Sequence, residues 1–379
     1  MSVNARLCFS LLLLTLTPFS TYAQSCTFGA PFVGPAITES LNARSIYASK
    51  PDFSNPVSTP LAHALEKRFE ETLQRTQASE ASISLYSPEH GFWSNSRGNT
   101  AQSKPFWLAS IGKLATAIVI TQLIEEKQLL PDDTIDRWFP EIPQSDLITI
   151  DQLLRHTSGL HNFNHIDSVR NQREYKSPAY LLEKSVDQGL DFCPGTDWNY
   201  SNTGYLVLAR IAEKLDEKTY ANIVQDRIAS PLNLSSFKVI SQDSDSNTIV
   251  TPVTTSAPEF RNDIAGIHGA GSIVSTTNDA ITFLSAYLRG QLISDSNIAD
   301  SLQRLYPVFN SSAHYGRGVM VIHVPDPDHP TVWVGHSGGA PDGKALLMFD
   351  LTRKTYLALA LNVQAPAEAI ANAILKELD

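Results

Sequence analysis

Hydrophobic and polar residues alternate with a period of two near both ends of the chain, a pattern typical of half-buried strands. These segments predict two hairpins, one from residues 82–86 with 92–94 and one from residues 344–349 with 356–363. Hydrophobic residues at helical spacing lie outside the hairpins, over residues 61–77 and 366–378. The chain is therefore expected to begin and end with a helix packed on paired strands.

Between these ends, residues 108–238 show mostly helical spacing, interrupted by Pro and Gly. Residues 24–56 are rich in Pro, Ser and Asn and predict an extended lead-in. We therefore predict an α+β fold, in which an antiparallel sheet is flanked by the N- and C-terminal helices and carries an inserted, mostly helical domain. The predicted boundaries place residues 57–107 and 250–379 in the sheet domain and residues 108–249 in the helical domain, with the active site between the two.

The first 23 residues have the three parts of a secretory signal peptide. Arg6 gives a positive start, residues 7–16 form a hydrophobic stretch too short to span a membrane, and Thr21–Ala23 form the cleavage site. We expect a mature chain that is periplasmic or secreted, without a transmembrane span. Lipid attachment at Cys26 is the alternative, but Ala23–Ser25 lack the leucine that such signals carry, so no lipid anchor is expected.

Composition removes several classes of function. The chain is 42% hydrophobic and 18% charged, which indicates a globular protein. Its net charge of -10, with no Lys/Arg-rich run, predicts no nucleic-acid partner. His161 and His165 have a metal-like spacing but lack the glutamate of zinc-protease helices, so no metal is predicted. Once the signal is removed, Cys26 and Cys193 remain, and they either form a disulfide or stay free.

Candidate chemistry begins with the spacing Ser-x-x-Lys, which occurs twice. In the first copy, Lys113 precedes residues 114–120, which are apolar nearly all round and typical of a buried helix. Burial and a helix N-terminus both lower the pKa of an amine, so Lys113 could accept a proton from Ser110, one turn away. The second copy, Ser235 and Lys238, lies in a polar connection and is interpreted as solvated.

Two further clusters place polar groups at the ends of predicted elements. Tyr200 lies in a loop before an apolar helix, whereas a second Tyr-x-Asn at Tyr220 lies inside a helical stretch and predicts a core residue. Residues 332–340 predict a strand that ends in glycines, where a ligand can approach closely. Its N–H groups would be oxyanion donors and could pair with an extended substrate. Taken singly, Tyr200 and His336 are more often structural residues.

Together the three clusters resemble the serine β-lactamase-related family, which includes class C β-lactamases, D-Ala-D-Ala peptidases and esterases. The resemblance extends from about Glu80 to the C-terminal end. The segments that carry it are Phe106–Lys113, Leu153–Leu160, Cys193–Tyr205, Ala270–Thr276 and His336–Gly338.

The resemblance implies that Ser110 attacks a carbonyl to form an acyl-enzyme while Lys113 and Tyr200 share the proton transfer. Tyr200 would need a cationic neighbour to lower its pKa, and Lys113 is the candidate. The N–H groups of Ser110 and Gly339 would form the oxyanion hole, and no cofactor is needed. The substrate-binding residues implied in this way are Asn202, His336, Ser337, Gly338 and Gly339.

One position departs from the family pattern. His336 stands where class C β-lactamases carry a lysine for the substrate carboxylate, and histidine is only partly charged at neutral pH. We therefore expect D-Ala-D-Ala carboxypeptidase-like or esterase activity, with β-lactamase activity as an alternative. A penicillin-binding sensor and a structural envelope protein also remain open. The expected partner is a small molecule or peptide with an acyl group, such as a peptidoglycan-like peptide, an ester or a β-lactam.

Overall fold

The structure is a computed structural model. The residues that it describes are 26–37, 41, 46, 48–99, 104–170, 174–252, 256–308, 312–326 and 329–379. The predicted signal peptide lies outside these residues. Within the described part of the chain, no helix is both long and apolar enough to cross a membrane.

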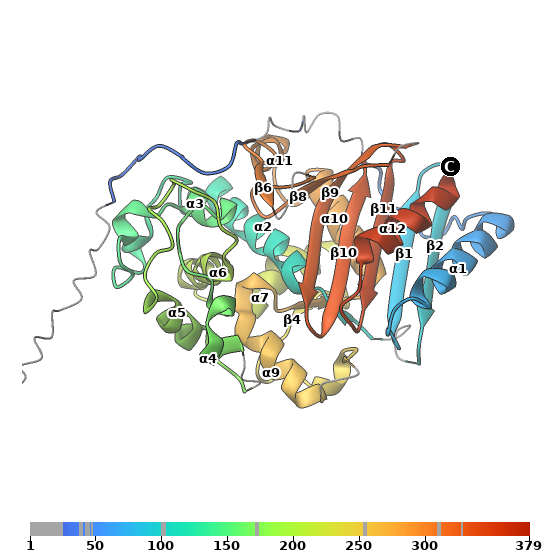
Figure 1. Cartoon of the computed structure of the whole chain (residues 1–379), viewed down its shortest axis with the longest axis horizontal. Helices are drawn as coiled ribbons and strands as arrows, with labels where there is room; N and C mark the ends of the chain where they lie inside the picture. The colour runs from blue at the N-terminus through green and yellow to red at the C-terminus, as the bar shows by residue number, and fades with distance from the viewer. Residues whose placement is uncertain are drawn as a thin grey trace, which may run out of the picture.

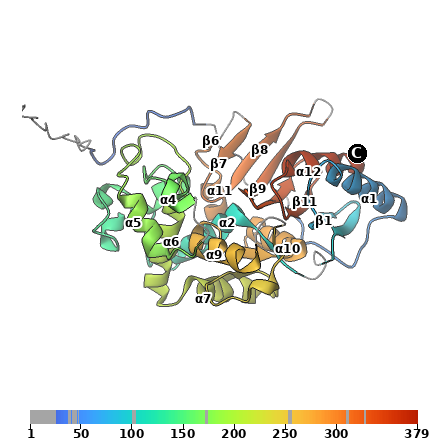
Figure 2. The same ribbon diagram turned by 60° about the horizontal axis from the view of Figure 1, so that its bottom comes forward.

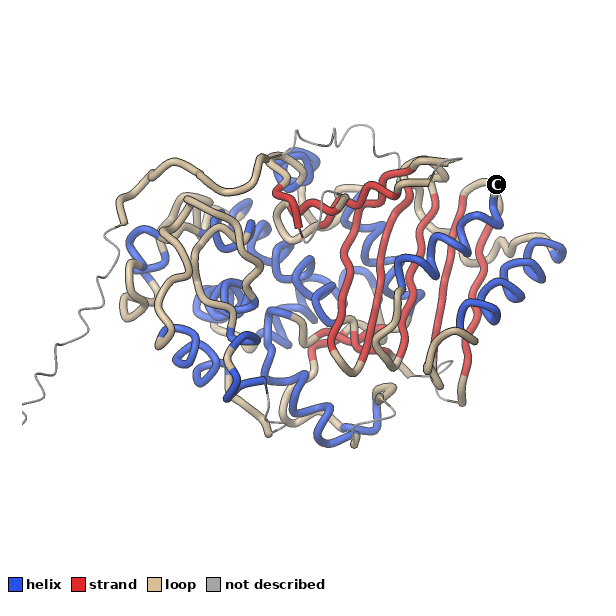
Figure 3. Tube along the Cα trace, viewed as in Figure 1, coloured by secondary structure: helices blue, strands red, loops and turns tan. Residues whose placement is uncertain are grey.

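An eight-stranded antiparallel sheet forms one side of the molecule (Figures 1 and 3). Its strand order is β2-β1-β11-β10-β9-β8-β7-β6. The strands are β1 (Ala81–Ser87), β2 (Gly91–Arg97), β6 (Tyr306–Val308), β7 (Ala313–Tyr315), β8 (Met320–Val324), β9 (Thr331–Ala340), β10 (Gly343–Asp350) and β11 (Thr355–Leu361). Both predicted hairpins are confirmed, and β1 pairs with β11, so strands from the two ends of the chain meet in one sheet.

The structure contains several short strands that the hydrophobic pattern does not predict. They are β6, β7 and β8 at one edge of the large sheet, and a second sheet of β3 (Phe106–Trp107), β5 (Ile273–Ser275) and β4 (Lys238–Val239). A strand this short contains too few residues to display an alternation, and its existence depends on pairing with distant segments.

Two helices cover one face of the large sheet, α1 (Thr59–Leu73) and α12 (Ala367–Leu375) (Figure 1). Between them and the sheet lies a core that includes Phe69, Trp333 and Ile374, all buried. Helix α1 ends earlier than the predicted residue 77, because Gln74 caps it. The predicted packing of terminal helices on the sheet is confirmed.

The other helices lie on the opposite side of the sheet (Figure 2). They are α2 (Gly112–Glu125), α3 (Ile150–Arg155), α4 (Asp167–Arg170), α5 (Pro178–Val186), α6 (Asn202–Asp216), α7 (Tyr220–Val224), α8 (Ser230–Leu232), α9 (Ala257–Ile267), α10 (Thr277–Leu288) and α11 (Asp295–Ser301). Helix α2 is buried on all sides from Gly112 to Thr121, as its sequence predicts. The α+β class is confirmed, and the domain boundaries stay predictions.

Cys26 and Cys193 form a disulfide. It attaches the lead-in to the loop between α5 and α6, and Val33 extends the contact by donating its N–H to the carbonyl of Thr196 at 2.6 Å. The alternative of two free thiols is therefore wrong for this structure.

Candidate active site

Ser110 lies where the sheet and the helices meet, in a short 3-10 turn before α2. The preceding Ala109 has a φ of 48°, in the left-handed region that a residue with a side chain enters at an energetic cost. This turn contacts β9 so closely that a Cβ on Gly338 would lie 2.2 Å from the Leu108 carbonyl oxygen and 3.1 Å from the Ser110 nitrogen. A glycine is therefore required at position 338.

Lys113 is fully buried, and its Nζ lies 3.2 Å from Ser110 Oγ. The same Nζ lies 2.6 Å from Asn202 Oδ1 and 2.6 Å from the Ala270 carbonyl oxygen. Burial lowers the pKa of Lys113 well below its usual value, which favours the neutral amine. A neutral amine has two hydrogens, and the two oxygens can only accept, so they take both. The lone pair is then left to face the Ser110 hydroxyl.

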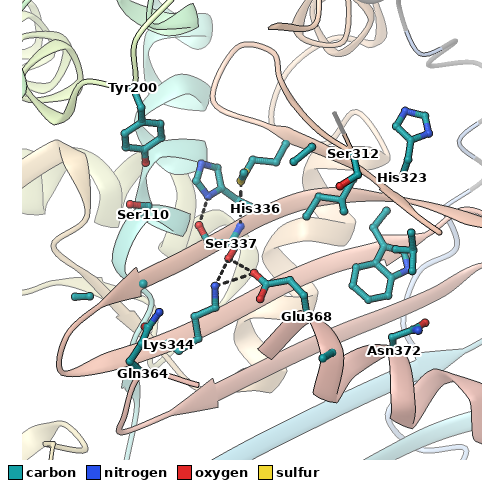
Figure 4. A pocket seen from close by; sticks show the side chains of 18 of the residues that line it. Ser110, Tyr200, Ser312, His323, His336, Ser337, Lys344, Gln364, Glu368 and Asn372 are labelled. Atoms are coloured by element: carbon teal, nitrogen blue, oxygen red, sulfur yellow. Dashed lines mark hydrogen bonds and ion pairs between the residues drawn. The ribbon is translucent and has the colours of Figure 1, made fainter. Parts of the chain in front are cut away.

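The Tyr200 hydroxyl is hydrogen-bonded to Ser110 and points toward it in Figure 4. The expectation that a cationic Lys113 lowers the pKa of Tyr200 is wrong. Burial raises that pKa, because a phenolate would lose its hydration, and a neutral Lys113 supplies no compensating charge. Tyr200 thus keeps its proton and can donate it.

His156 supports the loop that carries Tyr200, and it is a residue that the sequence reasoning did not single out. Its Nδ1 accepts a hydrogen bond from the Ser201 N–H at 3.1 Å, and its ring centre lies 4.3 Å from that of Tyr200. Burial is the main reason that the pKa of His156 is well below its usual value, so the ring is neutral. Its position within the family-like segment Leu153–Leu160 was the available signal.

His336 is also buried and neutral. Burial lowers its pKa to about 3, so it does not carry the partial charge expected at neutral pH. The Ser337 carbonyl oxygen, 2.6 Å from Nδ1, can only accept, so Nδ1 carries the hydrogen. Nε2 is then an acceptor, and the Tyr315 hydroxyl, 3.2 Å away, shares its single hydrogen between Nε2 and the Tyr205 hydroxyl, which is 3.4 Å from it.

The end of β9 presents an open edge, because β8 pairs with it only from Thr331 to Gly335. The Ser337 N–H points toward the β8 side, 3.5 Å from Met320 Sδ. Backbone N–H directions alternate along a strand, so the Gly339 N–H points to the same open edge. Gly339 can therefore offer an oxyanion donor there, as the sequence predicted.

A cleft of about 1010 Å³ borders this edge. The predicted residues that line it are Ser110, Tyr200, Asn202, His336, Ser337 and Gly339. Lys113 and Gly338 lie behind its surface, where they contact Ser110 and its backbone.

Two charged residues that the sequence reasoning missed also line the cleft, Lys344 and Glu368. Lys344 lies opposite Gly339 in the β9–β10 ladder, and the predicted strand 344–349 was a signal that could have placed it there. Glu368 reaches the cleft only because of the way α12 packs on the sheet, and the sequence has no local signal for that.

The repeated motifs lie outside the site. Tyr220 is buried, with its hydroxyl 2.6 Å from Thr116 Oγ1, as a core residue would be, and Lys238 lies in β4. His161 Nδ1 contacts Asp191 Oδ1 at 2.7 Å. Among the residues that the structure describes, no group of three or more His, Cys, Asp or Glu could hold a metal ion.

Comparisons with known proteins identify the family and the fold. The family model described as Beta-lactamase matches residues 67–378. Penicillin-binding protein 4* of Bacillus subtilis is 29% identical over 276 residues, which are 67% of this chain and 60% of that protein. Teichoic acid D-alanine hydrolase of Staphylococcus aureus is 27% identical over 129 residues, 34% of this chain and 31% of that protein. This chain thus spans less than two thirds of the length of both relatives.

Solved structures share the fold. D-amino acid amidase from Ochrobactrum anthropi SV3, complexed with L-phenylalanine amide, aligns with a TM-score of 0.75 and 21% identity, covering 84% of this chain and 99% of that one. The penicillin binding protein from Bacillus halodurans aligns with a TM-score of 0.69 and 19% identity, covering 82% and 99%. With a family model matched over most of its length, the chain belongs to the Beta-lactamase family.

Proposed function

We propose that this chain is a serine hydrolase that cleaves amide or ester bonds through an acyl-enzyme at Ser110. The observation that carries the proposal is the hydrogen-bond arrangement around Lys113. Its Nζ lies 2.6 Å from the Asn202 and Ala270 oxygens and 3.2 Å from Ser110 Oγ. In the neutral amine, the two hydrogens go to those oxygens, which can only accept, and the lone pair faces the Ser110 hydroxyl. An uncharged base in this position removes the serine proton without a cofactor.

In this mechanism, Lys113 takes the proton of Ser110 as Oγ attacks the substrate carbonyl. The negative charge that develops on the carbonyl oxygen is stabilised by the N–H groups of Ser110 and Gly339. Tyr200 then donates its proton to the leaving group and is reprotonated from Lys113, whose Nζ lies 4.8 Å from the Tyr200 ring centre. Water releases the acyl group by the reverse sequence of proton transfers.

The relatives support an acyl substrate from the cell envelope, because they are named as penicillin-binding proteins and as a teichoic acid D-alanine hydrolase. A D-alanyl ester or a D-Ala-D-Ala peptide is therefore proposed ahead of a β-lactam. The neutral state of His336 favours the ester within this group, because it provides no permanent cation for the carboxylate that a D-Ala-D-Ala peptide shares with a β-lactam. A periplasmic or secreted location is proposed with it.

The test uses p-nitrophenyl esters, nitrocefin and diacetyl-Lys-D-Ala-D-Ala with the wild type and with Ser110→Ala. Ser235→Ala, at the exposed serine of the second Ser-x-x-Lys, is the matched control. We expect turnover and an acyl adduct in mass spectrometry for the wild type and the control, and neither for Ser110→Ala. If all three proteins behave alike and none forms an adduct, the proposal is wrong. A penicillin adduct that persists for hours without turnover would favour a sensor instead.

A further inference from the structure

Three polar side chains from three different elements meet in the cleft, beside the open edge of β9 (Figure 4). Lys344 Nζ donates to Ser337 Oγ at 2.8 Å and to Glu368 Oε1 at 2.7 Å. Ser337 Oγ donates in turn to Glu368 Oε1 at 2.6 Å. The proposed catalytic steps use none of these three side chains, so the cluster needs an explanation of its own.

The two charges of the cluster are not equally accessible from the cleft. The Lys344 side chain is 12% exposed, whereas that of Glu368 is 37% exposed. Burial alone would raise the pKa of Glu368, but Lys344 and the hydrogen bonds outweigh it and hold that pKa below its usual value. Glu368 is thus an ionised group, and it is the only carboxylate among the described residues that line the cleft.

The hydrogen bonds of the cluster also favour a cationic ligand over an anionic one. The single hydroxyl hydrogen of Ser337 goes to Glu368, so Ser337 has none left for an anion. Both side-chain bonds to Glu368 end on Oε1, and its own backbone N–H also bonds its carboxylate. Among the described residues, no other side chain donates to Oε2. An incoming ammonium group could bind that oxygen without breaking a bond. A carboxylate would have only the third hydrogen of Lys344, whose side chain is 12% exposed, and it would lie beside the ionised Glu368.

We infer that Glu368 binds a protonated amine of the substrate, so that the enzyme prefers esters or amides that carry an ammonium group. This inference rests on the hydrolase function proposed above. Ser337 lies two residues from Gly339, on the order of 7 Å along the strand. The ammonium group is therefore several bonds away from the carbonyl that Gly339 binds, beside the path of an extended substrate.

The test measures kcat/KM for two matched series at low ionic strength. The first contains 4-nitrophenyl esters of 6-aminohexanoic, heptanoic and adipic acids, which end in an ammonium group, a methyl group and a carboxylate. The second contains the acetate esters of 6-aminohexanol and heptanol, with the charge on the leaving group. We expect about a tenfold preference for the ammonium member in one series, the size of a partly screened charge-assisted hydrogen bond. Added salt should reduce it.

Three variants distinguish the contribution of Glu368 from that of Lys344. Glu368→Gln should abolish the preference, whereas Glu66→Gln, the same change at an exposed position on α1, should keep it. Lys344→Met removes the neutralising partner of Glu368 and raises its pKa, so this variant should increase the preference at alkaline pH, where Glu368 stays ionised. Equal rates for ammonium and methyl members in both series, with turnover that still depends on Ser110, would overturn the ammonium site alone. A preference for the carboxylate that Lys344→Met removes would overturn it too. The absence of all turnover would instead overturn the hydrolase function and the site with it.

Discussion

The buried, neutral His336 should make the protein less stable as the pH falls. Its pKa is lowered from the ordinary 6.5 to about 3 in the folded state, mainly by burial. Below pH 6.5 the unfolded chain binds a proton at this residue that the folded chain does not bind until near pH 3. The stability that His336 contributes is therefore complete above pH 6.5 and is lost as the pH falls. From pH 7.5 to pH 5, linkage gives a loss of about 2 kcal/mol from this one residue.

Urea unfolding of the wild type and of His336→Gln, followed by circular dichroism at several pH values with the disulfide intact, measures this loss. The substitution has a cost of its own, but that cost is the same at every pH and cancels when only the pH dependence is compared. Between pH 7.5 and pH 5, the free energy of unfolding of the variant should fall by about 2 kcal/mol less than that of the wild type. Parallel curves for the two proteins would refute the reasoning, because they would mean that His336 binds its proton equally in both states.

Three further predictions concern the base, the strand contact and the disulfide. Because the pKa of Lys113 is lowered, kcat/KM for a neutral ester should stay high at neutral pH and fall on acidification, when Lys113 becomes protonated. A kcat/KM that rises only near pH 10 would contradict a neutral base. Gly338→Ala should slow acylation by about a hundredfold or more in stopped-flow assays, because its Cβ would meet the Leu108 carbonyl and displace the oxyanion donors. The control Gly343→Ala, whose added Cβ would lie 3.6 Å from its nearest atom, should act nearly as the wild type. Reduction of the disulfide, which joins residues 167 apart, should lower the free energy of unfolding by up to about 5 kcal/mol in urea titrations. Equal stabilities of the reduced and oxidised proteins would show that other contacts hold the lead-in.

Features set by neighbouring residues could be predicted from the sequence. The apolar run of residues 114–120, which follows Lys113 in its own helix, indicates a buried helix, so the burial of Lys113 could be inferred from the sequence. Both hairpins follow from alternation in the same way. The proposed base and the open strand edge could therefore be predicted from the sequence.

Features that depend on distant segments could not be predicted in this way. The direction of the Lys113 lone pair depends on Asn202 and Ala270, which lie 89 and 157 residues from Lys113. The contact of Glu368 with Ser337 depends on where α12 packs. The expectation that Lys113 lowers the pKa of Tyr200 was wrong, because burial raises that pKa.

The disulfide between Cys26 and Cys193 also divides the chain into a covalent ring and a linear remainder. Ser110 and Lys113 lie in the ring, whereas Tyr200 lies in the linear part. A single protease cut anywhere from residue 27 to residue 192 would open the ring without releasing a fragment, so the nicked protein would run as one band until it is reduced. A cut between residues 194 and 330 has no such protection, and under denaturing conditions it would separate the serine and the lysine from β9 and β10.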